Sequence, residues 1–116
     1  MSMPTVQEIL SGQLDQPIKQ VAAGTSSGAT ATEAAAVGKK HYITRVSGWV
    51  DAAQLVTLKD KATVVEEIKA LANTPFEMRF YPPQGITAGN LAEAKIANST
   101  SDCHITMYGF TIDEAA

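Results

Sequence analysis

The sequence has 116 residues, of which 18% are charged, and its formal net charge is −3. A chain of this length forms one domain with a core of its own. The mild negative charge argues against nucleic acid as a partner. The one basic cluster (Lys39, Lys40, His41 and Arg45) is better explained as a solvated rim. No apolar run approaches the roughly 20 residues of a membrane span, and nothing resembles a signal peptide, so we expect a soluble protein without a membrane partner.

The first 21 residues contain one helix signal. Thr5 and Glu8 have the spacing of a capping box, and the Ser11-Gly12 pair is typical of a helix end. The sequence therefore predicts a short helix near residues 5–11. A helix this short is not stable alone in water, so we expect the segment to bind a partner through its apolar residues, which are Val6, Ile9, Leu10, Leu14, Ile18 and Val21.

Small residues dominate the next stretch, AAGTSSGATATEAAA (22–36), in which only Glu33 is not Ala, Gly, Ser or Thr. Such a composition fits a flexible linker. It also fits an extended arm in a groove that admits only small side chains. With either interpretation, the sequence predicts an N-terminal arm over residues 1–36 and a folded domain over residues 37–116.

The rest of the chain has the pattern of β-strands. PFEMRFY (75–81) alternates apolar and polar residues with a period of two. A helix over residues 63–72 competes with a strand over 63–68, and we favour the strand because the segment starts with β-branched residues. The last strand is apolar on both faces, which indicates a central position in its sheet. The predicted strands cover residues 41–50, 54–59, 63–68, 75–81, 91–97 and 103–112. Short strands separated by turn signals predict a β-sandwich or a small barrel.

The stretch FYPPQGITAGN (80–90) raises the question of a phosphate-binding loop. It matches neither GxxxxGK[ST] nor GxGxxG. Pro82 and Pro83 offer no amide to a sheet and are expected to end the preceding strand. Gly85 and Gly89 suit positive-φ positions. We therefore predict a corner between two strands at this place.

No catalytic or metal-binding pattern is found. Cys103 and His104 are neighbours on a predicted strand, so their side chains point to opposite faces and cannot form an activated pair. A single cysteine allows neither an internal disulfide nor a cysteine-based zinc site. Glu66, Glu67 and Glu77 are better explained as an exposed charged face than as paired catalytic carboxylates. We expect no enzymatic activity, no metal and no cofactor.

Two segments resemble small structural proteins of tailed bacteriophages. These are HYITRVSGWVDAAQLVTLKDKATVVEE and PFEMRFYPPQGITAGNLAEAKIANSTSDCHITMYGFTI, and the shared features are the LKDKATV hairpin, the TAGN corner and the closing YGFTI strand. The chain is similar over about residues 40–112 to capsid decoration (cement or staple) proteins. The resemblance implies an all-β fold, a jelly-roll-like β-sandwich of about six to eight short antiparallel strands.

The resemblance also implies a function and partners. The expected protein is made in the bacterial cytoplasm and stabilises the outside of a capsid in the virion. Its expected partners are the major capsid protein and further copies of itself, as a homo-oligomer (dimer or trimer). The alternative is a carbohydrate- or receptor-binding module of a phage fibre or tail. That alternative requires Tyr42, Trp49 and Tyr81 to cluster on one open face.

Overall fold

The computed structural model describes residues 15–24, 28–97 and 102–113, and these residues form eight β-strands without a helix. The helix expected near residues 5–11 lies outside the described residues. The strands are β1 (Asp15–Gly24), β2 (Ala29–Glu33), β3 (Lys39–Val50), β4 (Gln54–Asp60), β5 (Thr63–Ala70), β6 (Thr74–Gly85), β7 (Ala92–Ile96) and β8 (Cys103–Asp113).

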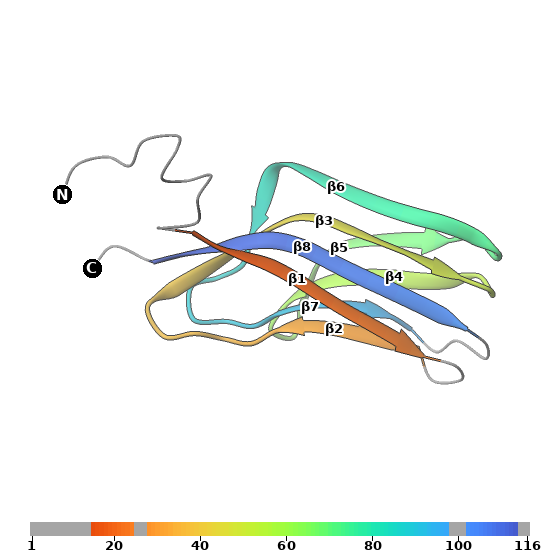
Figure 1. Cartoon of the computed structure of the whole chain (residues 1–116), viewed down its shortest axis with the longest axis horizontal. Helices are drawn as coiled ribbons and strands as arrows, with labels where there is room; N and C mark the ends of the chain where they lie inside the picture. The colour runs from red at the N-terminus through yellow and green to blue at the C-terminus, as the bar shows by residue number, and fades with distance from the viewer. Residues whose placement is uncertain (1–14, 25–27, 98–101, 114–116) are drawn as a thin grey trace.

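The eight strands form two four-stranded antiparallel sheets packed face to face (Figure 1). Sheet I has the order β1-β8-β3-β6, and sheet II has the order β2-β7-β4-β5. The pairs β1/β8, β2/β7, β3/β6 and β4/β5 are antiparallel, as if one long hairpin had been rolled up. Eight strands rolled into two sheets in this order make a jelly roll. The expected all-β antiparallel sandwich is confirmed.

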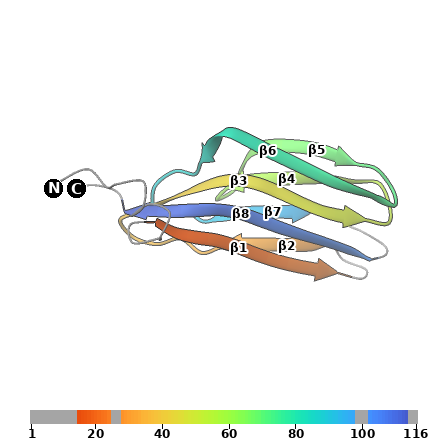
Figure 2. The ribbon, with the colours of Figure 1, turned by 45° about the horizontal axis from the view of Figure 1, so that its top comes forward.

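Alternate residues of both sheets point into a common core, as the period of a strand requires. Figure 2 shows the two layers that enclose it. The two prominent contributors from sheet I are β3 and β8, which are both central in that sheet. The largest fully buried side chains are Ile43, Leu58, Ile86, Ile96, Ile105, Met107, Val46, Val50 and Val56. The central position expected for the last strand is thus confirmed.

The predicted domain boundary at residue 37 needs correction, because residues 15–33 form two strands of the sandwich. β1 pairs with β8 from Asp15 to Gly24, and β2 pairs with β7 from Ala29 to Glu33. Of the six apolar residues assigned to a binding arm, Ile18 is a buried core residue and Val21 is 63% exposed on β1. Val6, Ile9, Leu10 and Leu14 lie outside the described residues.

The small residues of this segment have a structural reason. A Cβ added to Gly24 would lie 1.9 Å from the carbonyl oxygen of Gly28, so the backbone is tightly packed where β1 ends and the chain crosses to β2. Ala29 and Ala31 are buried against the core beside them. Small side chains therefore allow the sandwich to close along its β1/β2 side. A larger apolar residue was not needed, because backbone and β-carbons already fill the space.

The stretch 80–90 is a corner, as predicted, but its prolines do not end the strand. β6 continues through Pro82 and Pro83 to Gly85. This is possible because β6 is an edge strand with a neighbour on one side only. A proline whose missing amide would face the open side costs no backbone hydrogen bond. The corner follows at residues 86–91, and Gly89 has a positive φ of 81°. Residues 63–70 are a strand, so the competing helix is excluded.

Asp60, the last residue of β4, holds this corner in place. Its carboxylate accepts hydrogen bonds from the Thr87 backbone N–H (2.8 Å), the Thr87 hydroxyl (2.6 Å) and the Asn90 side-chain amide (2.8 Å). Burial alone would raise the pKa of Asp60. The bonds from Thr87 and Asn90, helped by the charge of Lys40, outweigh burial and lower that pKa below its ordinary value.

Replacing Ile18 tests whether β1 belongs to the folded domain. Ile18→Ala removes a core side chain that is 3% exposed, so we expect the free energy of unfolding to fall by about 2–4 kcal/mol. Val21→Ala, three residues away on the exposed side of the same strand, should change it by less than about 0.5 kcal/mol. Urea denaturation of both variants measures the difference. Equal, small effects would show that the segment is a separable arm.

Replacing Asp60 tests the carboxylate that holds the corner. Because the folded-state pKa is lowered, its stabilisation is present above the ordinary carboxyl range and is lost as the pH falls below about 4. Asp60→Asn should therefore cost about 1–2 kcal/mol at pH 7, since the site is partly exposed, and less near pH 3. Glu67→Gln, a change at an exposed carboxylate, is the control. A pH-independent difference would contradict this role.

Candidate binding face

Most aromatic side chains lie on the outer face of sheet I. The three phenylalanines, three tyrosines and single tryptophan are the aromatic residues of the chain. Phe76 and Phe80 point into the sandwich, where the first is buried and the second packs partly buried against the core. Alternation along the strands places the others outside. We call these five outward residues, together with the neighbouring Arg45 and His104, the aromatic face: Tyr42, Trp49, Tyr81, Tyr108 and Phe110, with Arg45 and His104.

Cross-strand pairs organise the aromatic face into a ladder. Residues of β3 and β8 that lie directly opposite each other make three ring contacts. Tyr42 stacks on Phe110 at 5.3 Å between centroids, and Trp49 stacks on His104 at 6.1 Å. Between them the Arg45 guanidinium lies 4.2 Å from the centroid of the Tyr108 ring. Such pairs stabilise a sheet, so the ladder is a fixed surface.

A β-bulge brings these residues to the same side. The register of β3 against both neighbours shifts between Ile43 and Arg45, which leaves Thr44 as an extra residue. A bulge re-aims the side chains that follow it. Tyr42 and Trp49 are seven positions apart, which is an odd number. In a strand without the bulge their side chains would therefore lie on opposite faces. No local pattern in residues 41–50 marks the bulge, and simple alternation over these residues would have misplaced one ring.

Tyr81 is the most exposed ring. In the register of β3 against β6, Ile43 pairs with Gln84 and Arg45 pairs with Arg79. Residues 80–83 of β6 therefore have no paired residue in β3. Tyr81 is fully exposed at 101% of its reference area. Beside it lies a depression of about 420 Å³. A second depression, of about 510 Å³, lies further along the same face near Gly48 and His104. The aromatic face is therefore not flat: the Tyr81 ring projects from it, and it contains two shallow depressions.

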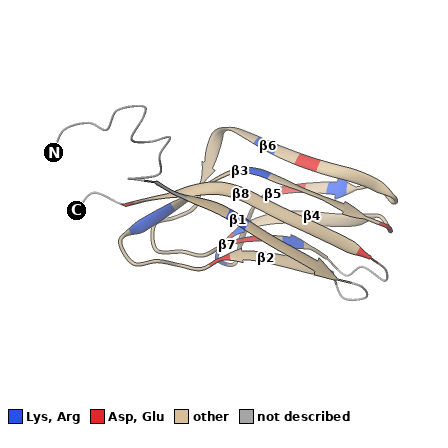
Figure 3. Cartoon of the chain, in the orientation of Figure 1, with Lys and Arg blue, Asp and Glu red and all other residues tan. Residues whose placement is uncertain are grey.

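The outer face of sheet II is different. None of its strands, β2, β4, β5 and β7, contains an aromatic residue. Threonine, lysine and glutamate dominate the outward positions, for example Thr57, Lys95 and Glu67. Figure 3 shows charges along β5 and β7 of sheet II. In sheet I, β6 also carries charges, whereas the central strand β8 has one only at its end. Of the two sheet faces, the aromatic face has the composition of a binding surface, since Tyr, Trp and Arg are enriched in interfaces.

The groups examined for catalysis are not brought together. Cys103 is buried, and His104 is exposed on the other side of β8, as alternation predicted. Glu66 and Glu67 point to opposite sides of β5. Within residues 15–24, 28–97 and 102–113, no three His, Cys, Asp or Glu residues are grouped as metal ligands. The described residues also contain no helix that could cross a membrane.

Comparison with known proteins supports the fold. No protein-family model matches the sequence, and no curated protein matches it significantly. The structure is similar to the coat protein of Tobacco streak virus, with a TM-score of 0.52 and 11% sequence identity, covering 100% of this chain and 91% of that chain. It is also similar to the CBM36-1 domain of a multidomain xylanase from the hindgut metagenome of Trinervitermes trinervoides (TM-score 0.41, 13% identity, coverage 88% and 98%). The first likeness shows a shared β-sandwich fold, and the second supports no inference.

A double-mutant cycle tests whether the ladder contributes to stability. Arg45→Met and Tyr108→Leu each remove one partner of the cation–π pair, and we expect a coupling energy of about 0.5–1 kcal/mol from urea denaturation. The control is a second cycle that combines Arg45→Met with Leu55→Ala on the outer face of sheet II. Its coupling energy should not exceed about 0.5 kcal/mol. A coupling energy near zero for Arg45 and Tyr108 would mean that the cation–π contact does not contribute to stability.

Proposed function

We propose that this protein is a structural component of a virion that uses the aromatic face to bind the outer surface of a tailed-bacteriophage capsid. It would act there as a decoration (cement) protein. The major capsid protein is the proposed partner, and bridging of neighbouring subunits would stabilise the shell. The observation that supports this proposal best is the concentration of tyrosine, tryptophan and arginine on one outer face of a sandwich with a filled core.

The packing of the rings favours a protein partner over a sugar. Sugar binding needs ring faces that are free for stacking. Tyr42 has Phe110 at 5.3 Å and the Lys40 amino group 5.2 Å from its centroid. Trp49 is stacked by His104. Rings with occupied faces still offer edges and area to a flat protein surface. A role without catalysis follows from the same proposal.

The alternative, a carbohydrate- or receptor-binding module, has one observation in its favour. Tyr81 is fully exposed and borders a hollow lined by Thr44, Arg79, Phe80 and Pro83. However, Tyr42 and Trp49 lie opposite Gly85 and Pro75, near the two ends of β6, so the three rings do not form one cluster. Binding to a glycan array without binding to particles would favour this alternative.

Particle binding is the direct test. Purified protein is added to capsids assembled without it, and the bound fraction is measured after sedimentation. We expect saturable, stoichiometric binding and a higher melting temperature of the shell, because a ligand that binds the assembled state stabilises it. Mass spectrometry of purified virions should also detect the chain in stoichiometric amounts. Its absence from virions, together with no binding, would contradict the proposal.

Replacing Tyr81 tests which face binds. Tyr81→Ala removes a ring that is fully exposed, so the fold should be unaffected, and we expect capsid affinity to fall roughly tenfold or more. Leu55→Ala, an exposed residue on the outer face of sheet II, is the matched control and should bind like the natural protein. Equal binding by both variants would show that the aromatic face is not the contact.

A further inference from the structure

The sandwich is closed along one long side and open along the other. On the β1/β2 side the chain crosses between the sheets from Gly24 to Gly28, and the Gln20 side-chain amide of β1 donates to the Glu33 carboxylate of β2 at 2.9 Å. On the β5/β6 side a groove of about 450 Å³ separates the edge strands of the two sheets. Ile68, Met78 and Phe80 form its apolar floor, and Ile68 and Phe80 are only partly buried. The edge groove, defined by these lining residues, is thus a part of the core that the described residues leave uncovered.

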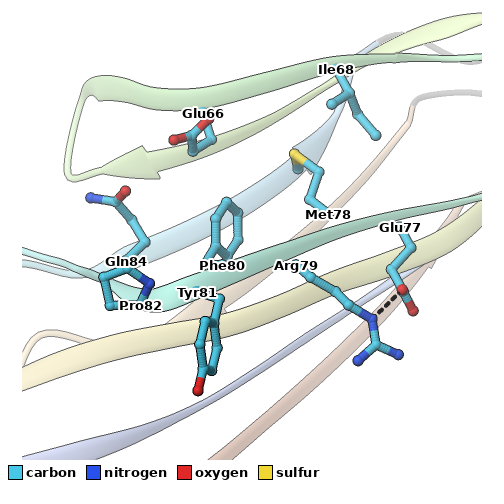
Figure 4. Close-up of a pocket in the computed structure, with 9 residues that line it drawn as sticks. All are labelled: Glu66, Ile68, Glu77, Met78, Arg79, Phe80, Tyr81, Pro82 and Gln84. Atoms are coloured by element: carbon cyan, nitrogen blue, oxygen red, sulfur yellow. Dashed lines mark hydrogen bonds and ion pairs between the residues drawn. The ribbon is translucent and has the colours of Figure 1, made fainter.

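An acidic group stands at the mouth of the edge groove. Figure 4 shows Glu66 pointing from β5 into the space above Phe80 and Gln84. The other carboxylate of the lining, Glu77, is paired with Arg79 and Arg45. Glu66 makes no ion pair with any residue that the structure describes. An apolar slot beside an unpaired carboxylate suits an apolar group that is flanked by a cation.

One segment of this chain has that chemistry. The turn between β2 and β3, residues 34–38 with the sequence AAAVG, carries no polar side chain and no side chain larger than valine. We call it the tip. Val37 is 99% exposed, and Lys39 and Lys40 follow directly. The tip is therefore narrow and apolar. Of the two lysines beside it, Lys39 is paired with Asp113 at 3.2 Å, whereas Lys40 has no ion pair with a described residue.

Hydrogen bonds hold the tip in a fixed position. The His41 Nε2–H donates to the Ala34 carbonyl (2.8 Å), and His41 Nδ1 then accepts from the Thr111 hydroxyl (2.7 Å). The Lys39 amide donates to the Ala36 carbonyl at 3.2 Å. A segment that is already ordered loses little entropy on binding. The tip leaves β2, which is the edge of sheet II opposite to β5, so it does not lie beside the groove of its own chain.

From these features we propose that the tip of one copy binds in the edge groove of a second copy. Val37 would cover Ile68 and Phe80, and Lys40 beside the tip would approach Glu66. Tip and groove are different surfaces, so a contact made in one direction is heterologous and produces a closed ring or an open chain of copies. It goes beyond the proposed function, since it does not use the ring ladder of the aromatic face.

Two pairs of matched variants of the full chain test this contact. Val37→Asp disables the tip, and Leu71→Asp is its control, because Leu71 is an apolar residue 63% exposed in the turn between β5 and β6. Glu66→Arg disables the groove, and Glu67→Arg on the other side of β5 is its control. Sedimentation velocity over a concentration series should show oligomers for the natural chain and both controls. The dissociation constant of the two disabling variants should rise at least roughly tenfold.

Mixing the two disabling variants distinguishes this contact from a symmetric one. Val37→Asp retains its groove and Glu66→Arg retains its tip, so a one-to-one mixture should form a complex of one chain of each and nothing larger, as measured by native mass spectrometry. A natural chain that stays monomeric, controls that dissociate like the disabling variants, or a mixture that forms no complex would each overturn the proposal. Tyr108→Leu, which changes the aromatic face and lies outside the lining of the edge groove, should keep its oligomers. A loss of capsid binding alone is thereby distinguished from a loss of the contact between copies.

Discussion

The arrangement of the outer surface depends on how closely β3 approaches β8. A Cβ added to Gly109 would lie 2.0 Å from the Tyr42 carbonyl oxygen and 3.0 Å from the Ile43 Cα. No other residue could be accommodated there without displacing β3. Gly109 lies opposite Ile43, where the bulge begins. The missing side chain therefore permits the close passage of the two strands, and the bulge that follows turns Arg45 and Trp49 to the side of Tyr42.

The two long sides of the sandwich differ in how far they cover the core. The β1/β2 side is sealed by glycine and alanine, so it contributes to the core without exposing apolar area. The β5/β6 side keeps part of the core accessible in a groove. The interior of the sandwich is filled mainly by aliphatic side chains of the described residues. The surfaces that remain for function are the faces, the turns and the open side.

Regular patterns in the sequence predicted the regular parts of the fold. PFEMRFY alternates because β6 has one face in the core, and the doubly apolar 103–112 segment is central in its sheet. The errors occurred where backbone contact replaces side-chain packing. Residues 22–36 contain no large apolar residue, yet Gly24 and Ala31 belong to strands, since the neighbouring backbones fill the space. The aromatic face was not predicted because it depends on one extra residue, Thr44, that no local pattern marks.

The four edge strands carry features that oppose continuous sheet formation. In sheet I, β1 contains Pro17, and β6 contains Pro75, Pro82 and Pro83. In sheet II, β2 is only five residues long, and β5 points Glu66 toward the interior. Prolines, short edges and inward charges all hinder the pairing of an exposed strand with a foreign one. These features thereby protect the protein against the fusion of sheets from different copies into amyloid-like aggregates.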